Sequence, residues 1–276
     1  MIYLLLAIFS GTATSVIMRC SKSRIKSDMG MLAANYLACT LLAGYFAGAG
    51  ELFPAGAGGA LGLGLFNGAL YLISLMLMQY NVPRSGIVLT SIYSKLSLIV
   101  PLVLSLTVFG EKPGAAQIIG FLLSLAAIVM INYQPGAEAP QVNGGLLALF
   151  AVDGCVYSMS KIFEELFGQN FSAQFLFYTF GVALLISAGM LLAKKERPGW
   201  PDLLFGFLFG IPNYFASRLT LKALSVLPAV IVYPTNGVGT LAAVAFAGVL
   251  IFKERLTKRQ WKAVAIILLA IALLNL

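Results

Sequence analysis

The sequence predicts an all-α integral membrane protein with ten transmembrane helices, built from two inverted five-helix repeats. Composition is the first reason: 60% of the 276 residues are hydrophobic and 10% are charged, whereas soluble domains are about half apolar and a quarter charged. The second is a mean hydropathy of +0.93, with recurring runs of the roughly 20 apolar residues that cross a bilayer. The third is an internal repeat, in which matching positions such as Phe109 and Phe252 lie 143 residues apart.

Ten apolar runs define the expected spans. They are too long and too little alternating for the strands of a membrane barrel, so helices are expected. In chain order they cover residues 2–19, 30–48, 59–80, 85–109, 114–132, 144–163, 171–193, 201–222, 227–251 and 258–275. The loops between them are short, which leaves no room for a soluble domain.

The repeat relates the two halves of the chain without a gap. The offset of 143 residues pairs Phe66 with Phe209, Tyr71 with Tyr214, Glu111 with Glu254, Gln117 with Gln260 and Asn132 with Asn275. Five spans separate equivalent positions, and an odd number of crossings inverts the second copy in the bilayer, as in many secondary transporters. The expected division is a first repeat at 1–133, a connecting loop at 134–143 and a second repeat at 144–276.

Individual spans differ in what they carry. The first lacks a basic region before its apolar core, so we expect an uncleaved span rather than a signal peptide. The third opens with glycines from Gly56 to Gly68, and the eighth has Gly206 and Gly210 at the corresponding place. Small residues four apart let helices pack closely in lipid. The fifth and tenth spans carry almost nothing polar and are expected to face lipid or a partner subunit.

The net charge of +8 arises mainly in loops beside the spans. No basic groove interleaved with aromatic residues is present, so nucleic acid is not an expected partner. The loops after spans one, three, seven and nine contain Arg19, Lys22, Arg24, Lys26, Arg84, Lys194, Lys195, Arg197, Lys253, Arg255, Lys258, Arg259 and Lys262. The positive-inside rule assigns these loops to the cytoplasm, which places both termini outside.

Residue types and motifs that the sequence lacks exclude several classes of function. The chain has no His, which excludes His-based catalysis and His metal sites, and it has no Walker A loop with which to use ATP. Cys20, Cys39 and Cys155 lie in or at the ends of apolar spans without metal-binding spacing, and are expected to be small buried hydrophobes. We therefore expect neither an enzyme nor a bound cofactor or metal.

Ionisable residues deep in the spans are the candidates for function, because charge is costly inside a bilayer. Lys95 lies near the middle of the fourth span, and Asp153 lies at a matching depth in the sixth. The two form either a structural ion pair or a site for a charged substrate or proton, and both roles coexist if the ligand opens the pair. Arg218 in the eighth span is a third candidate. Lys161 and Lys222 lie near span ends and are expected to snorkel to the interface.

Polar residues on neighbouring spans complete the predicted site. Asn67, Tyr71 and Ser74 share one face of the third span. In the ninth span, Pro234 and Gly237 free backbone groups of the kind found at binding sites, although a purely structural kink is an alternative. The predicted substrate-binding residues are Lys95, Asp153, Arg218, Tyr71, Tyr214, Tyr93, Asn67, Tyr157, Tyr233 and Asn236.

The ten short spans, the five-helix repeat and its Glu-containing turns resemble the drug/metabolite transporter superfamily, EamA type, over essentially the whole chain. In the first copy the matching residues are Pro101, Gly110, Glu111 and Gly120. The second copy keeps Glu254, while Lys253 and Ala263 replace the two glycines. The resemblance implies a central cavity lined by spans one, three, four, six, eight and nine, with alternating access between two bundles. It also implies cytoplasmic termini, but we favour the outside location because the charge imbalance is large.

The expected function is secondary active transport or export of a small polar or amphipathic metabolite. An amino acid or organic anion is favoured, because Lys95 and Arg218 can pair with a carboxylate or phosphate. The alternative is an exporter of cationic or aromatic drug-like compounds with Asp153 as counter-charge. An intramembrane lipid-modifying enzyme and a scaffold or channel are remote alternatives.

The repeat breaks at the predicted site. The positions equivalent to Lys95, Arg218 and Asp153 are Val238, Leu75 and Ser10. Each charge therefore stands in one half only, which favours a role in substrate binding over a role in the shared scaffold. The expected partners are a small-molecule substrate and the lipid bilayer of a bacterial inner membrane, with the chain a monomer or homodimer. Proton coupling, counter-substrate exchange and facilitated diffusion all stay open.

Overall fold

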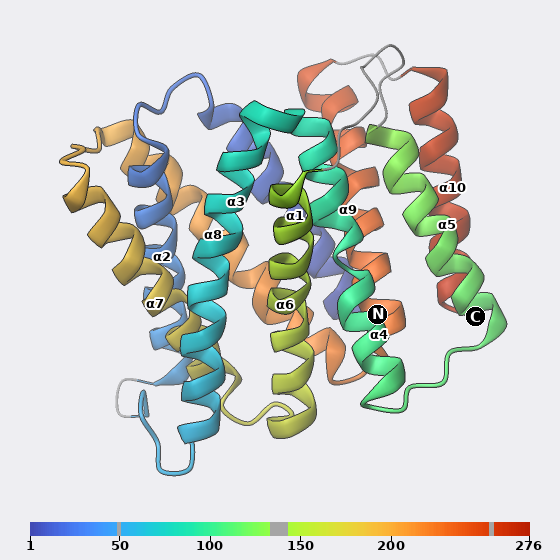
Figure 1. The fold of residues 1–276 in the computed structure, drawn as a ribbon, viewed down its shortest axis with the longest axis horizontal. Coiled ribbons are helices and arrows are strands. Elements are labelled where there is room, and N and C mark those ends of the chain that lie inside the picture. Colours follow the sequence, from blue (N-terminus) through green and yellow to red (C-terminus); the bar gives the residue numbers. More distant parts are fainter. Residues whose placement is uncertain (49–50, 133–142, 254–256) are drawn as a thin grey trace. The chain divides into compact units, whose positions relative to one another are not determined.

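The computed structural model describes residues 1–48, 51–132, 143–253 and 257–276, and within these ranges every regular element is a helix (Figure 1). The helices are α1 Ile2–Ser21, α2 Asp28–Ala47, α3 Gly58–Leu96, α4 Ile99–Thr107, α5 Ala115–Asn132, α6 Gly144–Phe167, α7 Ser172–Ala193, α8 Trp200–Leu224, α9 Ala229–Phe252 and α10 Lys258–Leu274. The predicted all-α class is confirmed. The predicted connecting loop, 134–143, falls outside the described residues except for Asn143.

Seven helical stretches in the described residues are long and apolar enough to cross a membrane. They are Ile2–Ser21, Asp28–Ala47, Gly58–Gly86, Leu89–Thr107, Gly144–Phe167, Ser172–Ala193 and Ala229–Phe252. A shorter apolar helix covers Ala115–Ile131. The other two helices are less apolar, because α8 contains Asp202, Arg218 and Lys222, while the 17-residue α10 begins with Lys258-Arg259. The chain is an integral membrane protein with multiple crossings.

The boundary between the predicted third and fourth spans is wrong. Residues 81–84, expected as a loop, are helical even though Pro83 lies among them. The break comes instead at Gly86, whose φ of +78° is a conformation that glycine adopts without a steric penalty. The Arg84 guanidinium supports the preceding turn, since Nη1 donates to the Tyr80 carbonyl at 2.9 Å and the group lies 3.7 Å from the Tyr80 ring. A second interruption, at residues 97–98, separates α3 from α4.

The chain folds into two compact units, and each draws on both halves of the sequence. Unit 1 contains Met1, Ile73–Lys161 and Val226–Leu276, and unit 2 contains Ile2–Leu72 and Ile162–Ser225. The unit boundaries therefore pass through α3 and α6. The division into two sequential repeats concerns chain order and stays a prediction.

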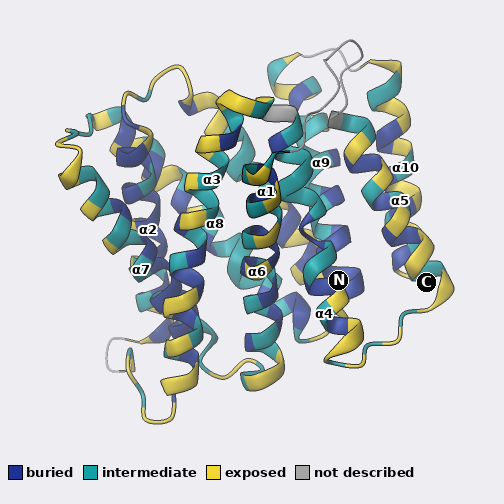
Figure 2. Ribbon diagram, in the orientation of Figure 1, coloured by how far each residue is buried: buried dark blue, intermediate teal, exposed yellow. Residues whose placement is uncertain are grey.

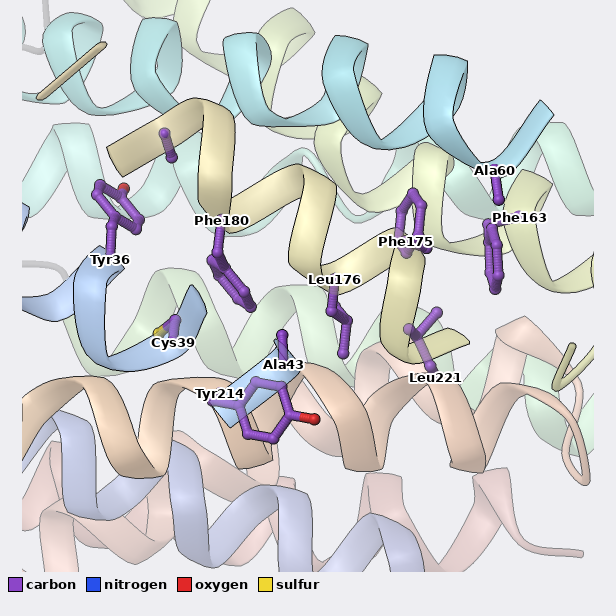
Figure 3. Close-up of a cluster of buried hydrophobic side chains, with 11 residues drawn as sticks. Tyr36, Cys39, Ala43, Ala60, Phe163, Phe175, Leu176, Phe180, Tyr214 and Leu221 are labelled. Atoms are coloured by element: carbon purple, nitrogen blue, oxygen red, sulfur yellow. The ribbon is translucent and has the colours of Figure 1, made fainter. Parts of the chain in front are cut away.

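Unit 2 is held by aromatic residues and close helix contacts. Phe163 and Phe175 stack at 4.3 Å between ring centroids, within a cluster that also includes Phe180 and Tyr214 (Figure 3). The eighth span's glycines allow α8 to approach α2, because a Cβ atom at Gly206 would lie 2.4 Å from the Met31 carbonyl oxygen. The glycines of α3 have the same effect against α7: a Cβ at Gly68 would lie 2.5 Å from the carbonyl oxygen of Thr179. The predicted packing role is confirmed for Gly206 and Gly210 and, on α3, for Gly59, Gly64 and Gly68. It is wrong for Gly56, Gly58 and Gly62, where a Cβ atom would meet nothing within 4 Å.

Unit 1 pairs α5 with α10, the plain helices of the two repeats. A Cβ atom at Gly120 would lie 2.9 Å from the Ala270 carbonyl oxygen, so glycine is needed at this contact. The outer faces of both helices expose large apolar residues (Figure 2), namely Ile118, Ile119 and Leu122 on α5 and Leu268 and Leu269 on α10. Lipid can cover these faces without a penalty.

The cysteines fit their prediction only in part. Cys39 is buried, but Cys20 and Cys155 are exposed on the surface of the chain. An apolar residue in a membrane span does not have to be covered by protein, because lipid tails are equally apolar. The expectation of burial therefore holds for one cysteine of three.

Candidate functional site

The predicted site residues fall into two groups, one in each unit. Unit 1 contains Tyr93, Lys95, Asp153, Tyr157, Tyr233 and Asn236, and unit 2 contains Asn67, Tyr71, Tyr214 and Arg218. Each group has its own pattern of contacts.

Asp153 is the centre of the unit 1 group. Its side chain is buried on α6, with the residue 6% exposed. The hydroxyls of Ser74 and Ser94 donate hydrogen bonds to its two carboxylate oxygens, one each. Both serines lie on α3, on opposite sides of the break at Gly86. The Asp153 side chain therefore connects the two segments of α3 to α6 through these two hydrogen bonds.

Lys95 lies next to Ser94 and interacts electrostatically with Asp153. The lysine is only partly buried. Within the described residues its ammonium makes no hydrogen bond and no ion pair shorter than 4.0 Å. The ammonium group is thus partly buried, and its N–H donors are available to a ligand.

Two tyrosines of the predicted site join α6 to α9. The Tyr233 hydroxyl donates to the Tyr157 carbonyl oxygen at 2.7 Å, and their rings meet edge to face at 6.0 Å. Tyr233 is buried, while Tyr157 and Asn236 are partly buried, as is Tyr93 on α3. The hydrogen bond from Tyr233 to Tyr157 gives Tyr233 a role in packing α9 against α6.

Lys161 does not snorkel to the interface as predicted. Its ammonium lies 2.9 Å from Oε1 of Glu111, and its side chain is 4% exposed. The same oxygen accepts the backbone N–H of Ala229, the first residue of α9, at 3.0 Å. A carboxylate is stabilised at a helix N-terminus, and a buried cation needs a partner. Glu111 therefore stabilises both the start of α9 and the buried Lys161 ammonium. The signals in the sequence were the repeated Glu turn and the spacing of four between Asp153, Tyr157 and Lys161.

The unit 2 group holds its cation on aromatic rings. The Arg218 guanidinium lies 3.8 Å from the Phe46 ring centroid and donates to the Tyr214 hydroxyl at 2.9 Å. Phe46 and Tyr214 stack nearly parallel, with centroids 5.8 Å apart. Among the described residues, no carboxylate pairs with Arg218. Phe46 was not predicted, because an aromatic residue in an apolar span gives no signal of its own.

The remaining predicted residues pack against α7. Asn67 is buried, and its Nδ2 donates to Thr179 Oγ1 at 3.4 Å. Tyr71 meets Phe180 edge to face at 6.1 Å. These contacts give both residues a packing role within unit 2.

A surface cavity of about 490 Å³ also lies in unit 2. Its lining residues are Glu51, Pro54, Asn170, Phe171 and Gln174. None of them belongs to the predicted site. The Gln174 side chain donates to the Glu51 carbonyl oxygen at 3.0 Å, so part of the polar lining is already engaged.

Comparison with known proteins finds a transporter family similar to the second half of the chain. Residues 145–276 match the EamA-like transporter family. The second half of the chain is thus similar to this family of transporters. This confirms the resemblance derived from the Glu turns and the repeat.

Two further likenesses extend beyond the EamA-like domain. An uncharacterised protein of Haemophilus influenzae is 26% identical over 216 residues, which cover 76% of this chain and 72% of that protein. A solved crystal structure superposes with a TM-score of 0.76 at 13% identity, covering 99% of this chain and 94% of that one. At this identity the likeness concerns the fold alone. The similarity of residues 145–276 to the EamA-like family and the membrane helices together indicate a membrane transporter of small molecules.

Proposed function

We propose that this protein is a secondary active transporter, most simply an exporter, of a small amphipathic metabolite that carries a carboxylate. It works in the bacterial inner membrane by alternating access, without a cofactor and without enzymatic turnover. An amino acid or another organic anion is the substrate class. The observation that carries the proposal is the partly buried Lys95 ammonium beside Asp153.

The contacts of Lys95 and Asp153 support an anionic or zwitterionic ligand. Serine hydroxyls already donate to both oxygens of Asp153, whereas the Lys95 ammonium has no such partner in the described residues. A substrate carboxylate would pair with Lys95, and the nearby Asp153 would attract a substrate ammonium group. Such charge-assisted hydrogen bonds are about twice as strong as neutral ones.

The aromatic group around Arg218 supports an amphipathic substrate. A guanidinium that lies on an aromatic ring keeps most of its N–H donors free for an anion. The rings beside it offer apolar surface to a small molecule.

Export of cationic or aromatic drug-like compounds is the second candidate. It uses Asp153 as the counter-charge for the cation. One observation weighs against it: a bound cation without a carboxylate of its own would lie close to Lys95 and would not pair with that lysine.

Flux into proteoliposomes tests the proposal. Purified protein would be screened for counterflow of labelled amino acids, dicarboxylates and cationic aromatic compounds. Lys95→Ala should lower the flux of the transported anion about 30-fold or more, the effect of removing about 2 kcal/mol of ion pairing. Lys112→Ala, which removes an exposed loop lysine, is the matched control and should transport normally.

The same assay separates the alternatives. Normal flux in Lys95→Ala would show that Lys95 does not bind the substrate. Movement of cations but not of anions or zwitterions would favour the drug exporter. Turnover of a lipid without net solute movement would instead indicate an enzyme, and flux driven by an imposed pH gradient would indicate proton coupling.

A further inference from the structure

Two basic loops from different halves of the sequence meet at one end of unit 2. One joins α1 to α2, and the other joins α7 to α8. Their exposed cations are Lys22, Arg24, Lys26, Lys194, Lys195 and Arg197, which we call the basic rim.

The acidic residues at these loops are Asp28, Glu196 and Asp202. Two of them, Glu196 and Asp202, accept hydrogen bonds from the loops. Asp202 accepts the backbone N–H of Lys26 at Oδ1 and that of Gly199 at Oδ2, both at 2.7 Å. The Ser27 hydroxyl donates to Oε2 of Glu196 at 2.5 Å. Within the described residues, no cation of the basic rim forms an ion pair with a carboxylate. The six cations outnumber the three acidic residues, so this end of unit 2 carries a net positive charge.

Packing holds the two loops together. A Cβ atom at Gly30 would lie 2.6 Å from the Cβ of Pro198, so the loops approach as closely as glycine allows. The Arg24 guanidinium lies 5.8 Å from the Phe205 ring. Beside them Trp200, at the start of α8, is 74% exposed, and exposed tryptophans are typical of the headgroup level of a membrane. The cations are thus presented by a fixed scaffold at the ends of membrane helices.

We propose that the basic rim binds the headgroups of anionic phospholipids. Phosphate groups at the membrane surface lie at the level where these helices end, and lysine and arginine both bind phosphate through charge-assisted hydrogen bonds. Each cation near an anionic membrane surface raises affinity about fivefold. Six cations on one scaffold make this end of unit 2 selective for phosphatidylglycerol over phosphatidylcholine.

Thermal unfolding with added lipid tests this assignment. The full-length protein in a neutral detergent would be heated with phosphatidylglycerol, with phosphatidylcholine or with inorganic phosphate. Binding to the native state raises the apparent Tm, and near-saturating phosphatidylglycerol should raise it by about 5 °C. Phosphatidylcholine and inorganic phosphate should leave it unchanged. An equal shift with inorganic phosphate would overturn the lipid assignment.

A matched pair of triple variants locates the effect. Lys26→Gln, Lys194→Gln and Lys195→Gln together should abolish the shift with phosphatidylglycerol. Lys112→Gln, Lys258→Gln and Lys262→Gln remove the same charge from exposed positions in unit 1 and should retain it.

Two results would overturn the proposal. One is an equal loss of the shift in both triple variants, because the lipid would then respond to net charge alone. The other is an unchanged amount of phosphatidylglycerol retained by the rim variant in native mass spectrometry. Native mass spectrometry reports lipid binding directly, so it tests the proposal even if the rim variant is less stable.

Discussion

Two lysine–carboxylate pairs in unit 1 use the same helix, α6, and have opposite characters. Lys161 and Glu111 are in direct contact at 2.9 Å, with side chains 4% and 14% exposed. Lys95 and Asp153 interact only electrostatically, and serine hydroxyls rather than the lysine occupy the carboxylate. We call the first pair closed, because its ammonium and carboxylate contact each other. We call the second pair open, because they do not.

The difference shows that a charge inside a span is not by itself evidence of a binding site. A closed pair offers no cation to a ligand, because its ammonium is already paired and separating the two groups would leave a buried charge uncompensated. An open pair is held by other groups and leaves an ammonium available. Function is therefore expected at Lys95 and Asp153, and structural support at Lys161 and Glu111.

The largest expected effect is on stability, from breaking the closed pair. Glu111→Ala removes the carboxylate that contacts the buried Lys161 at 2.9 Å and that accepts the N–H of Ala229, which should cost about 3–5 kcal/mol. The melting temperature of the purified protein should fall by about 10 °C. Replacing both partners, Glu111→Leu with Lys161→Leu, should recover most of the loss. A melting temperature as little changed as in Lys112→Ala would show that the pair is not structural.

Asp153→Asn should affect transport more than stability. The amide removes the negative charge beside Lys95 and converts one acceptor of a serine hydrogen bond into a donor, so flux should fall about 30-fold. Stability should fall by only about 1–3 kcal/mol, since the polar contacts are partly kept. Flux and melting temperature measured on the same preparation separate the two effects. A loss of flux that merely tracks the loss of folded protein would contradict the assignment.

The sequence alone predicts the helices well and their interruptions poorly. Each of the ten apolar runs corresponds to helix, because runs of about 20 apolar residues in lipid have to satisfy their backbone hydrogen bonds internally. The error lies at Pro83, where a loop was expected. Proline is tolerated there, whereas Gly86 has the positive φ that breaks the helix. The local sequence does not tell which of two neighbouring helix breakers acts.

The candidate site was predictable as a set of charges but not as a set of contacts. Lys95 and Asp153 stand out because ionisable residues are rare in spans. Ser74 was placed on the polar face of the third span, but its bond to Asp153 depends on how α3 meets α6. Glu111 lay in a repeated turn that also looked like pure scaffold. The partners depend on tertiary contacts, which the sequence pattern does not encode.

Removing the serine hydroxyls should give a smaller effect than removing the charge. Ser74→Ala and Ser94→Ala each delete one hydrogen bond to the Asp153 carboxylate, worth about 1.5–3 kcal/mol. We expect flux to fall about tenfold, mainly through a higher KM, as the carboxylate loses its fixed position. Ser158→Ala is the matched control, because that buried hydroxyl bonds to the Gly154 carbonyl of its own helix. Equal effects in all three variants would mean that the serines only support packing.

Arg218 of unit 2 differs from both lysines, because no carboxylate in the described residues pairs with its guanidinium. Tyr214→Phe removes the hydroxyl that accepts from Arg218 at 2.9 Å but keeps the stacked ring. The net value of such a bond is about 1 kcal/mol, so KM should rise about fivefold at most. Phe46→Leu removes the ring beneath the guanidinium, for a loss of similar size. If instead both variants transport normally while Arg218→Ala does not, the guanidinium binds the substrate directly and the rings merely pack around it.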